Sequence, residues 1–371
     1  MISVFEPDIN FSDIWYVLKN LYNKNISGTS PVVKEFEETL AKKFKRKYAL
    51  SVSSGSVALD LMLNLAGVNE DDEIILPSFT IISCLSAVIR VGAKPVFCDV
   101  DEKSWNMTLK NVKECVTENT KAILMVHTYG LTAEGIEISN FCNERGITLL
   151  EDAAEAHGQN ISGKLCGSFG LISSLSFYAN KHITTGEGGV VLTDNEEIYL
   201  KGLQMRNLDF TSKKRFQHDN LFWNYRMSGL QAALGLSQIK RIEKVVRDKK
   251  KQGESYSRVL KQYSKYIDLP KKNINTVENH FWVYGVVLKK DGIRDQVMER
   301  LFSKGIETRP FFWPLHKQDA LPLPYKDKIV ILPTSENLGK NGLYLPLGKN
   351  ITTKQIAYIA ESLIGSIKES Y

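Results

Sequence analysis

The stretch FYANKHITTGEGG, residues 177–189, decides which fold and which chemistry the sequence predicts. An apolar, aromatic run leads into Lys181, which is followed by His182 and a glycine-rich turn. A free lysine is protonated at neutral pH, but burial or a nearby cation lowers the pKa of a lysine, which then forms Schiff bases with carbonyls. Glycines beside such a lysine allow the backbone to approach a ligand closely. Whether Lys181 is a reagent therefore depends on what the fold places beside it.

Short apolar runs recur through the first half of the chain. Most are continuously apolar, as is typical of strands that are covered on both faces. Helix-like stretches separate several of them, and two of these, 57–67 and 138–146, end on glycine. The alternation predicts an α/β domain with a mostly parallel sheet. The predicted strands are 48–54, 73–77, 94–100, 122–130, 147–153, 173–178 and 189–193.

Three of these runs end on residues that can bind a ligand, and parallel sheets bind ligands at the carboxyl ends of their strands. Residues 53–56, SSGS, open a helix whose N-terminus suits a phosphate. Asp152 and Lys181 add a carboxylate and an amine. Pyridoxal phosphate needs these three groups for its phosphate, its ring nitrogen and its aldehyde. Taken singly, they are a turn, a helix cap and a solvated strand end, but their combination favours a site.

The pattern changes after about residue 235, which predicts a second domain. A long polar helix at about 237–265 leads into mixed strands and helices, and an amphipathic helix at 351–370 has Thr352 or Thr353 as its cap. We predict a large domain over 1–240 and a smaller α+β domain over 241–371. The N-terminal segment of about 1–29 is expected to pack on the smaller domain.

Composition excludes several classes of protein. The chain has 371 residues, 43% of them hydrophobic, which is enough for two cores. Its five cysteines are irregularly spaced without C-x-x-C, so we expect no disulfide framework and no metal site. The N-terminus does not resemble a signal peptide, and no run approaches the roughly 20 apolar residues of a membrane span. We expect a cytoplasmic protein that binds no nucleic acid, whose net charge of +6 helps to attract an anionic substrate.

Three blocks of sequence resemble one family. They are EDAAEAHG (151–158), GSFGLISSLSFYANKHITTGEGG (167–189) and WNYRMSGLQAALGLSQI (223–239). The chain resembles, over nearly its whole length, the sugar aminotransferase family (DegT/DnrJ/EryC/StrS type) of fold-type-I pyridoxal-phosphate enzymes. The resemblance implies an aspartate-aminotransferase-like three-layer domain and transamination of a nucleotide-linked ketosugar, with glutamate as donor and the pyridoxamine form of the cofactor as intermediate. It also implies a homodimer with shared active sites and a product destined for a surface polysaccharide such as the O-antigen of lipopolysaccharide.

The resemblance assigns roles to individual residues. Lys181 matches the lysine that forms the Schiff base and shuttles the proton, and Asp152 matches the partner of the ring nitrogen. Ile81 stands where the family usually has an aromatic residue stacked on the ring, so this contact has a less specific geometry. The other cofactor contacts match Gly55, Ser56, Glu155, Ser176 and Asn224, the last from the neighbouring subunit. Weaker candidates for substrate contacts are His157, which is equally consistent with a structural role, Arg226, Arg309, whose guanidinium suits a diphosphate, and His316.

The identity of the sugar rests on resemblance alone. Lysine at position 181, where some relatives have histidine and act as ketosugar dehydratases, favours transamination. The TTGEGG turn resembles members that act on 4-keto sugars, and GDP-4-keto-6-deoxymannose, converted to GDP-perosamine, is the favoured acceptor. A UDP- or dTDP-linked 4-ketohexose, and less so a 3-keto one, is the alternative.

Two further hypotheses concern other classes of protein. A nicotinamide oxidoreductase is disfavoured, because no G-x-G-x-x-G follows the first strand. A catalytically silent binding protein on the same fold is disfavoured by the presence of Lys181, Asp152 and Asn224 together.

Overall fold

The computed structural model describes residues 1–210, 216–326 and 329–370. Its centre is a seven-stranded sheet in the order β1-β9-β8-β5-β4-β2-β3. All strands run parallel except β9, which is antiparallel to both of its neighbours. Each predicted run forms one strand: β1 (Tyr48–Val52), β2 (Glu73–Pro77), β3 (Lys94–Cys98), β4 (Thr120–Val126), β5 (Thr148–Asp152), β8 (Ile172–Ser176) and β9 (Gly189–Thr193).

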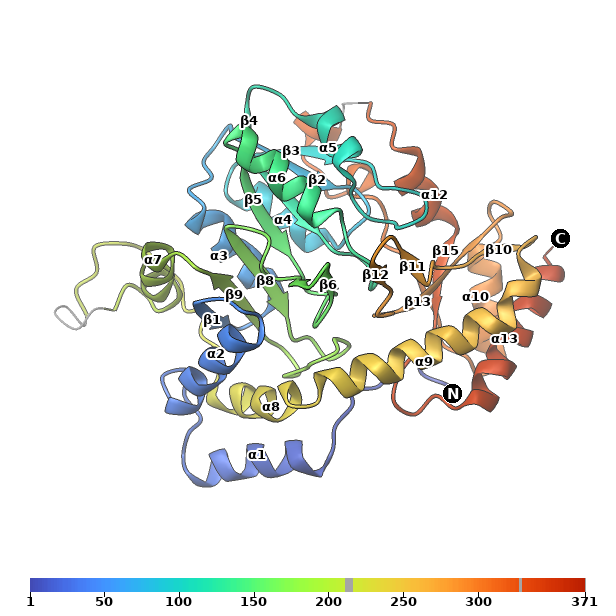
Figure 1. Ribbon diagram of the computed structural model, residues 1–371, viewed down its shortest axis with the longest axis horizontal. Helices are drawn as coiled ribbons and strands as arrows, with labels where there is room; N and C mark the ends of the chain where they lie inside the picture. The colour runs from blue at the N-terminus through green and yellow to red at the C-terminus, as the bar shows by residue number, and fades with distance from the viewer. Residues whose placement is uncertain (211–215, 327–328, 371) are drawn as a thin grey trace.

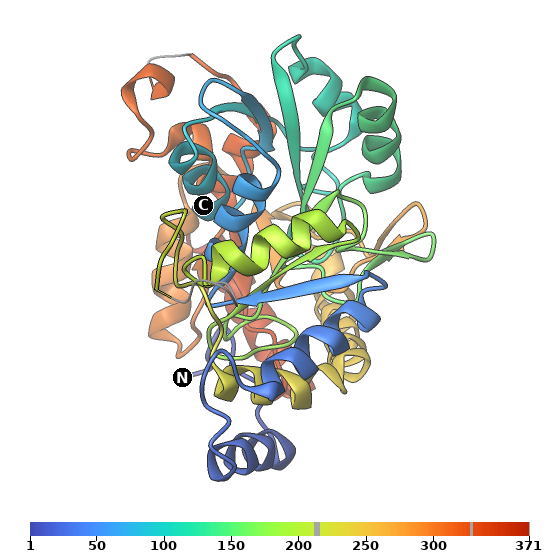
Figure 2. The same ribbon diagram turned by 90° about the vertical axis from the view of Figure 1, so that its left-hand side faces the viewer.

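Helices cover both faces of this sheet, which makes three layers (Figures 1 and 2). Two separate hydrophobic clusters result, because successive residues of a strand point to opposite faces. Figure 2 shows β1 between α7 on one face and α2 on the other. The first face carries α3 (Gly55–Leu65), α4 (Ile82–Arg90) and α7 (Glu196–Arg206), and the second α2 (Pro31–Lys43), α5 (Leu109–Cys115), α6 (Gly135–Arg145) and α8 (Gly229–Ile239).

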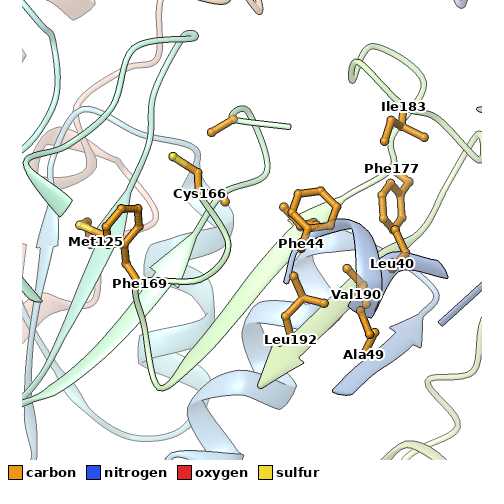
Figure 3. Close-up of a cluster of buried hydrophobic side chains, with 14 of the residues drawn as sticks. Leu40, Phe44, Ala49, Met125, Cys166, Phe169, Phe177, Ile183, Val190 and Leu192 are labelled. Carbon is orange, nitrogen blue, oxygen red and sulfur yellow. The ribbon is translucent and has the colours of Figure 1, made fainter. Parts of the chain in front are cut away.

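Figure 3 shows part of the cluster on the second face, where Leu40 of α2 and Phe44, which directly follows this helix, lie over Val190 and Leu192 of β9. These side chains are at most 2% exposed, and burial of each leucine, valine or phenylalanine contributes about 1.5–3 kcal/mol. This core fixes the positions of the strand ends on which the predicted site depends.

A smaller antiparallel sheet, in the order β10-β13-β15-β14, follows in the chain. Its core contains side chains from the helices beside it and from both of its inner strands. The strands are β10 (Ile267–Asp268), β13 (Tyr284–Leu288), β14 (Arg309–Pro310) and β15 (Gly342–Leu345), and the helices that contribute to this core are α9 (Ile242–Leu260), α10 (Arg294–Ser303) and α13 (Thr353–Lys368). α12 (Pro333–Asn341) packs on β13 and β15, and α11 (Leu323–Lys326) on the short helical turn Leu315–Lys317.

The helix predicted at 237–265 is wrong at its start, because α8 ends at Ile239 and α9 begins at Ile242. Arg241, with φ −120° and ψ 14°, breaks the helical path, and its guanidinium bonds Asp13 at 2.7 Å. α8 is largely buried under the first sheet, whereas α9 leaves it and runs along the second (Figure 1). The C-terminal helix is confirmed, and the Oγ1 of Thr352 caps it at the N–H of Gln355.

All strands of the seven-stranded sheet come before residue 240 in the chain, and all strands of the four-stranded sheet come after it. The division into domains 1–240 and 241–371 stays a prediction. The N-terminal segment contacts both parts. Ile2 and Val4 bond to Gly305 and Leu347 of the second part, whereas α1 (Phe11–Tyr22) packs on α8. Within the described ranges, none of the helices has the length and apolar character needed to cross a membrane.

Candidate active site

A cavity of about 320 Å³ lies at the carboxyl ends of β1, β5 and β8, on the face that carries α3 and α4. Eight of the twelve residues that the sequence predicted for the site line it. They come from distant parts of the chain, and the parallel sheet brings them together as its topology requires. These residues are Gly55, Ser56, Ile81, Asp152, Glu155, Ser176, Lys181 and Arg309.

The first turn of α3 forms one end of the cavity. Ser54 caps the helix by accepting a hydrogen bond from the N–H of Val57, which leaves the N–H groups of the first turn directed at a ligand. A Cβ on Gly55 would lie 2.6 Å from the Cβ and 2.9 Å from the Oγ of Ser176, so only glycine brings this turn against β8. Ser56 Oγ lies 2.8 Å from Ser83 Oγ. The turn has the shape, the hydroxyls and the helix dipole that bind a phosphate.

The glycine-rich turn after Lys181 contributes Glu187 to the lining of the cavity and leads into β9 at Gly189. We expected its glycines to let the backbone pass close to a ligand. A Cβ on Gly189, the first residue of β9, would lie 2.4 Å from the carbonyl oxygen of Ser54. Gly189 therefore allows β9 to pass close to the first turn of α3, while the closer approach of the other glycines to a ligand stays a prediction.

Asp152 lies at the end of β5 and points into the cavity. Its Oδ1 accepts a hydrogen bond from the N–H of Ala154 at 2.9 Å, and the thiol of Cys84 lies 3.5 Å from Oδ2. Burial raises the pKa of Asp152, although the Ala154 N–H and the charge of Lys181 oppose the rise. A buried carboxylate with few partners gains most from a protonated ring nitrogen in the cavity.

The side chains of Lys181 and Glu155 meet in the cavity. Lys181 Nζ lies 3.4 Å from Glu155 Oε1, and Glu155 Oε2 accepts a hydrogen bond from the N–H of Tyr129 at 3.0 Å. Burial raises the pKa of Glu155 to about 7, while the charge of Lys181 and the Tyr129 N–H oppose the rise. The site therefore holds an amine beside a carboxyl group that exchanges its proton near neutral pH.

Sequence reasoning missed the aromatic wall of the cavity. Tyr178 lies three residues before Lys181, but the other three aromatic residues belong to the region of the second sheet. The pattern of apolar residues predicted strands there, without indicating that the second sheet would pack against the first. The missed wall consists of Tyr178, Trp282, Phe312 and Tyr344.

Four predicted residues do not line the cavity of their own chain. Asn224 and Arg226 belong to a segment beside the end of β1, where the N–H of Ser53 bonds the carbonyl of Tyr225 at 2.9 Å. The weakly predicted substrate contact of His316 finds no support, because its Nδ1 lies 2.6 Å from Ser78 Oγ and its Nε2 3.0 Å from Glu336 Oε1, where it joins α12 to the first sheet.

His157 and His182 are buried behind the cavity, with their ring centroids 6.2 Å apart. Burial lowers the pKa of His157 to about 3 and that of His182 well below its usual range. Both rings are therefore neutral, and the ring of His157 packs on that of Phe177 with the centroids 5.6 Å apart. His157 does not line the cavity, and both of its ring nitrogens are buried without a hydrogen-bond partner among the described residues, so the choice between its two interpretations stays open.

Comparisons with known proteins agree with the geometry. The model of the DegT/DnrJ/EryC1/StrS aminotransferase family matches residues 8–364. The chain is 33% identical to the GDP-perosamine synthase of Escherichia coli O157:H7, over 98% of this chain and 97% of that one. It is 28% identical to the dTDP-4-dehydro-2,3,6-trideoxy-D-glucose 4-aminotransferase of Saccharopolyspora spinosa, over 97% and 95%.

Solved structures of related enzymes have the same fold. The structure of the E. coli GDP-4-keto-6-deoxy-D-mannose-3-dehydratase with bound hydrated PLP superposes with a TM-score of 0.90 at 29% identity, over 98% of this chain and 100% of that one. The chain therefore belongs to the DegT/DnrJ/EryC1/StrS aminotransferase family, and pyridoxal phosphate is its cofactor.

Proposed function

We propose that this chain transfers the amino group of glutamate to the C4 ketone of a nucleotide-linked 4-keto-6-deoxy sugar. GDP-4-keto-6-deoxymannose is the acceptor that we favour, with GDP-perosamine as the product. One observation carries the amination: the amine of Lys181 lies in a cavity that also holds a buried carboxylate and a phosphate-binding turn. The similarity to a GDP-perosamine synthase supports this choice of sugar.

The residues of the cavity fit the cofactor. The first turn of α3, with Ser56 and Ser176, would hold its phosphate, Asp152 would pair with its ring nitrogen, and Lys181 would hold its aldehyde. When bound, pyridoxal phosphate supplies a carrier for the amino group and a ring that accepts the electron pair of the broken C–H bond. Ile81, which is 39% exposed at the start of α4, covers one side of the cavity without an aromatic ring.

Lys181 moves the proton. Its amine takes the α-proton of glutamate, which leaves as 2-oxoglutarate, and later delivers a proton to C4 of the sugar, which gains the amino group. The negative charge of Asp152 favours a positive ring nitrogen through both halves of the reaction. Glu155 lies within reach of the same amine and limits its positions.

Arg309 is the residue that we propose for the diphosphate of the substrate. It lines the cavity from β14, and its guanidinium lies 5.0 Å from the centroid of the Phe5 ring and 3.6 Å from Glu307. Its side chain is 42% exposed, so it stays accessible to a ligand that enters from solvent. A guanidinium binds paired phosphate oxygens in a planar, bidentate geometry.

A second copy of the chain would complete the site. Asn224 and Arg226 do not line their own cavity, and we propose that they reach that of a partner. α1 exposes an apolar stripe formed by Phe11, Trp15 and Leu18, together with Tyr22, at helical spacing. Such a stripe is a candidate for the surface that the second copy covers.

A mixing experiment tests the shared site. Lys181→Ala and Asn224→Ala each inactivate their own homodimer, but a mixed dimer has one site with both residues intact. We expect a 1:1 mixture to regain roughly a quarter of the wild-type activity after subunit exchange. A mixture that stays inactive, although light scattering shows dimers that exchange, contradicts the shared site.

The acceptor is tested with a panel of nucleotide-linked ketosugars and glutamate, with products identified by mass spectrometry and NMR. The proposal expects an equatorial amine at C4 of a GDP-linked 6-deoxymannose. Activity on UDP or dTDP sugars alone, as for the S. spinosa relative, favours the alternative acceptors. Loss of the C3 hydroxyl instead of amination favours a dehydratase like the one from E. coli. If Lys181→Ala retains full turnover, the proposed role of Lys181 is wrong.

A further inference from the structure

Trp282, which lies two residues before β13, contacts the segment of Lys181 twice and α9 once. Its indole N–H donates to the carbonyl of Asn180 at 3.0 Å. Its own carbonyl accepts a hydrogen bond from Lys249 Nζ at 2.8 Å. The face of its ring lies 3.9 Å from Lys181 Nζ, measured to the ring centroid. One residue of the second part of the chain therefore contacts both the backbone and the amine of the lysine segment.

The ring of Trp282 is held in this orientation. It is 5% exposed, and its centroid lies 5.8 Å from that of Tyr129 within a cluster that joins the two parts of the molecule. Because the N–H is bonded and the edge is packed, the face toward the cavity is the part that a ligand or a side chain can reach. The face of an indole carries negative potential and attracts a cation.

Lys249 supports the arrangement from behind. Its Nζ lines a smaller cavity of about 40 Å³ together with Lys181 and His182. Burial, and then the charge of Lys181, lowers the pKa of Lys249 to about 7. The hydrogen bond from Lys249 holds the main chain at Trp282. It thereby helps to fix the distance between the indole ring and Lys181.

We propose that Trp282 is a positioning residue, whose indole face receives the amine of Lys181 whenever that amine is not bonded to the cofactor. This inference rests on the proposed function, because a transamination requires Lys181 to leave the cofactor in the first half-reaction and to return to it at the end of the second. A released lysine side chain has four rotatable bonds and would spread over many rotamers. Trp282 and Glu155 confine it to a place from which it reaches the reacting carbon, and the ring favours the ammonium that forms when Lys181 takes up the α-proton.

Kinetics of the glutamate half-reaction form the first test. Trp282→Leu removes the ring face, whereas Trp282→Phe keeps a face and loses the N–H. We expect Leu to lower the rate constant at saturating glutamate by about 3- to 30-fold, with little change in KM, and Phe to lower it less. Trp105→Leu is the matched control, because Trp105 packs in the same cluster, 5.2 Å from Phe311, and lines a different cavity. Equal effects of Trp282→Leu and Trp105→Leu on this rate constant contradict the proposal.

A second measurement does not depend on turnover. Lysines of the cofactor-free protein are dimethylated with ¹³C-formaldehyde, and the resonance of Lys181 is assigned by its loss in Lys181→Ala. We expect this resonance upfield of the other lysine methyls, owing to the ring current of Trp282, still upfield in Trp282→Phe, and at the position of the others in Trp282→Leu. Trp282→Met replaces the Leu variant if the latter does not fold.

The outcomes separate the two proposals. A wild-type resonance among the other lysine methyls, or one that is unmoved in Trp282→Leu, overturns the positioning role. Neither result bears on the sugar. Failure of the sugar panel, in turn, leaves the resonance of Lys181 unchanged.

Discussion

Glu151 and Asp152 are consecutive residues of β5, and both are buried, but they differ in the number of their hydrogen-bond partners. Because side chains alternate along a strand, Glu151 points to the face covered by α2, α5 and α6, and Asp152 to the face that carries α3 and the cavity. One carboxylate is surrounded by donors from the protein. The other has few, and it faces space that a ligand fills.

Glu151 accepts hydrogen bonds from five groups. His127 Nε2 lies at 3.0 Å, and Ser173 Oγ at 2.8 Å. Burial alone would raise the pKa of Glu151, but the bond from His127, followed by those from Gly167 and Ser173, lowers it. The remaining donors are the N–H groups of Gly167, Phe169 and Gly170.

Glu151, His127 and Cys166 also place ligand atoms within 4.8 Å of one another, which is the spacing of a metal site. His127 uses both ring nitrogens within the protein, because its Nδ1 accepts from the N–H of Ala133. Both side chains are thus already satisfied, and the cluster fits a structural role better than a metal site. The comparison teaches that burial of a carboxylate does not mark a functional residue; the shortage of partners at Asp152 does.

The largest effect is expected at Asp152. Asp152→Asn keeps the shape and the Ala154 bond but removes the charge that we propose pairs with the ring nitrogen. We expect kcat/KM for glutamate to fall by about 10²- to 10³-fold, with a nearly unchanged unfolding temperature. Steady-state kinetics and thermal denaturation measure the two quantities. If Asp152→Asn loses stability and keeps its activity, Asp152 serves the fold and not the chemistry.

Glu151→Gln is expected to show the opposite profile. It replaces an acceptor of five hydrogen bonds by a group that accepts at one atom and donates at the other, so buried donors lose their partner. We expect the free energy of unfolding to fall by about 3–5 kcal/mol, as for other broken buried pairs. Urea denaturation measures this loss, and the kinetics of the folded fraction serve as the control. A loss of turnover larger than the loss of folded protein would place Glu151 in the chemistry.

Glu155 is a second carboxyl group that lines the same cavity as Asp152, and the dependence of stability on pH tests whether burial raises its pKa. Burial raises the pKa of Glu155 from 4.5 to about 7, so between these values the folded protein holds a proton that the unfolded chain has released. The stability from this group is full below about pH 4.5 and is lost as the pH rises through about 7, by about 3 kcal/mol.

The measurement is the free energy of unfolding of the cofactor-free protein between pH 5 and 7.5. The control is Glu155→Gln, which cannot titrate and is expected to have a flatter dependence on pH over this range. Identical slopes for the two proteins contradict the raised pKa.

The smallest effects are expected from two neighbouring serines of β8. Like Glu151 and Asp152, one of them is bonded within the protein and the other faces the cavity. Ser173 donates to Glu151, whereas Ser174 lines the cavity and its Oγ is buried without a hydrogen-bond partner in the described part of the chain. We expect Ser173→Ala to cost about 1 kcal/mol of stability and Ser174→Ala to cost less. Chemical denaturation of both variants makes the comparison. A larger loss for Ser174→Ala would show that the face of the cavity is the one that holds the fold.

Much of the site could be predicted, because its residues follow strands. Gly55, Asp152 and Lys181 each stand directly at or soon after the end of a buried apolar run, and a parallel sheet places such ends along one edge. Trp282 and Tyr344 could not be found in this way. They reach the cavity because the second sheet packs against the first through a cluster of aromatic side chains. Local patterns carry no information on that packing.

The sequence by itself determined the seven strands, their mostly parallel arrangement and the set of amine, carboxylate and phosphate-binding turn. Those features depend on local periodicity and on chain order, which can be read from the residues directly. Only the tertiary structure decided that Glu151 has five hydrogen-bond donors around it and Asp152 has two, and that Lys181 meets Glu155 and the face of Trp282. These contacts join residues far apart in the chain, and the number of hydrogen-bond partners around a buried group depends on every element that packs against it.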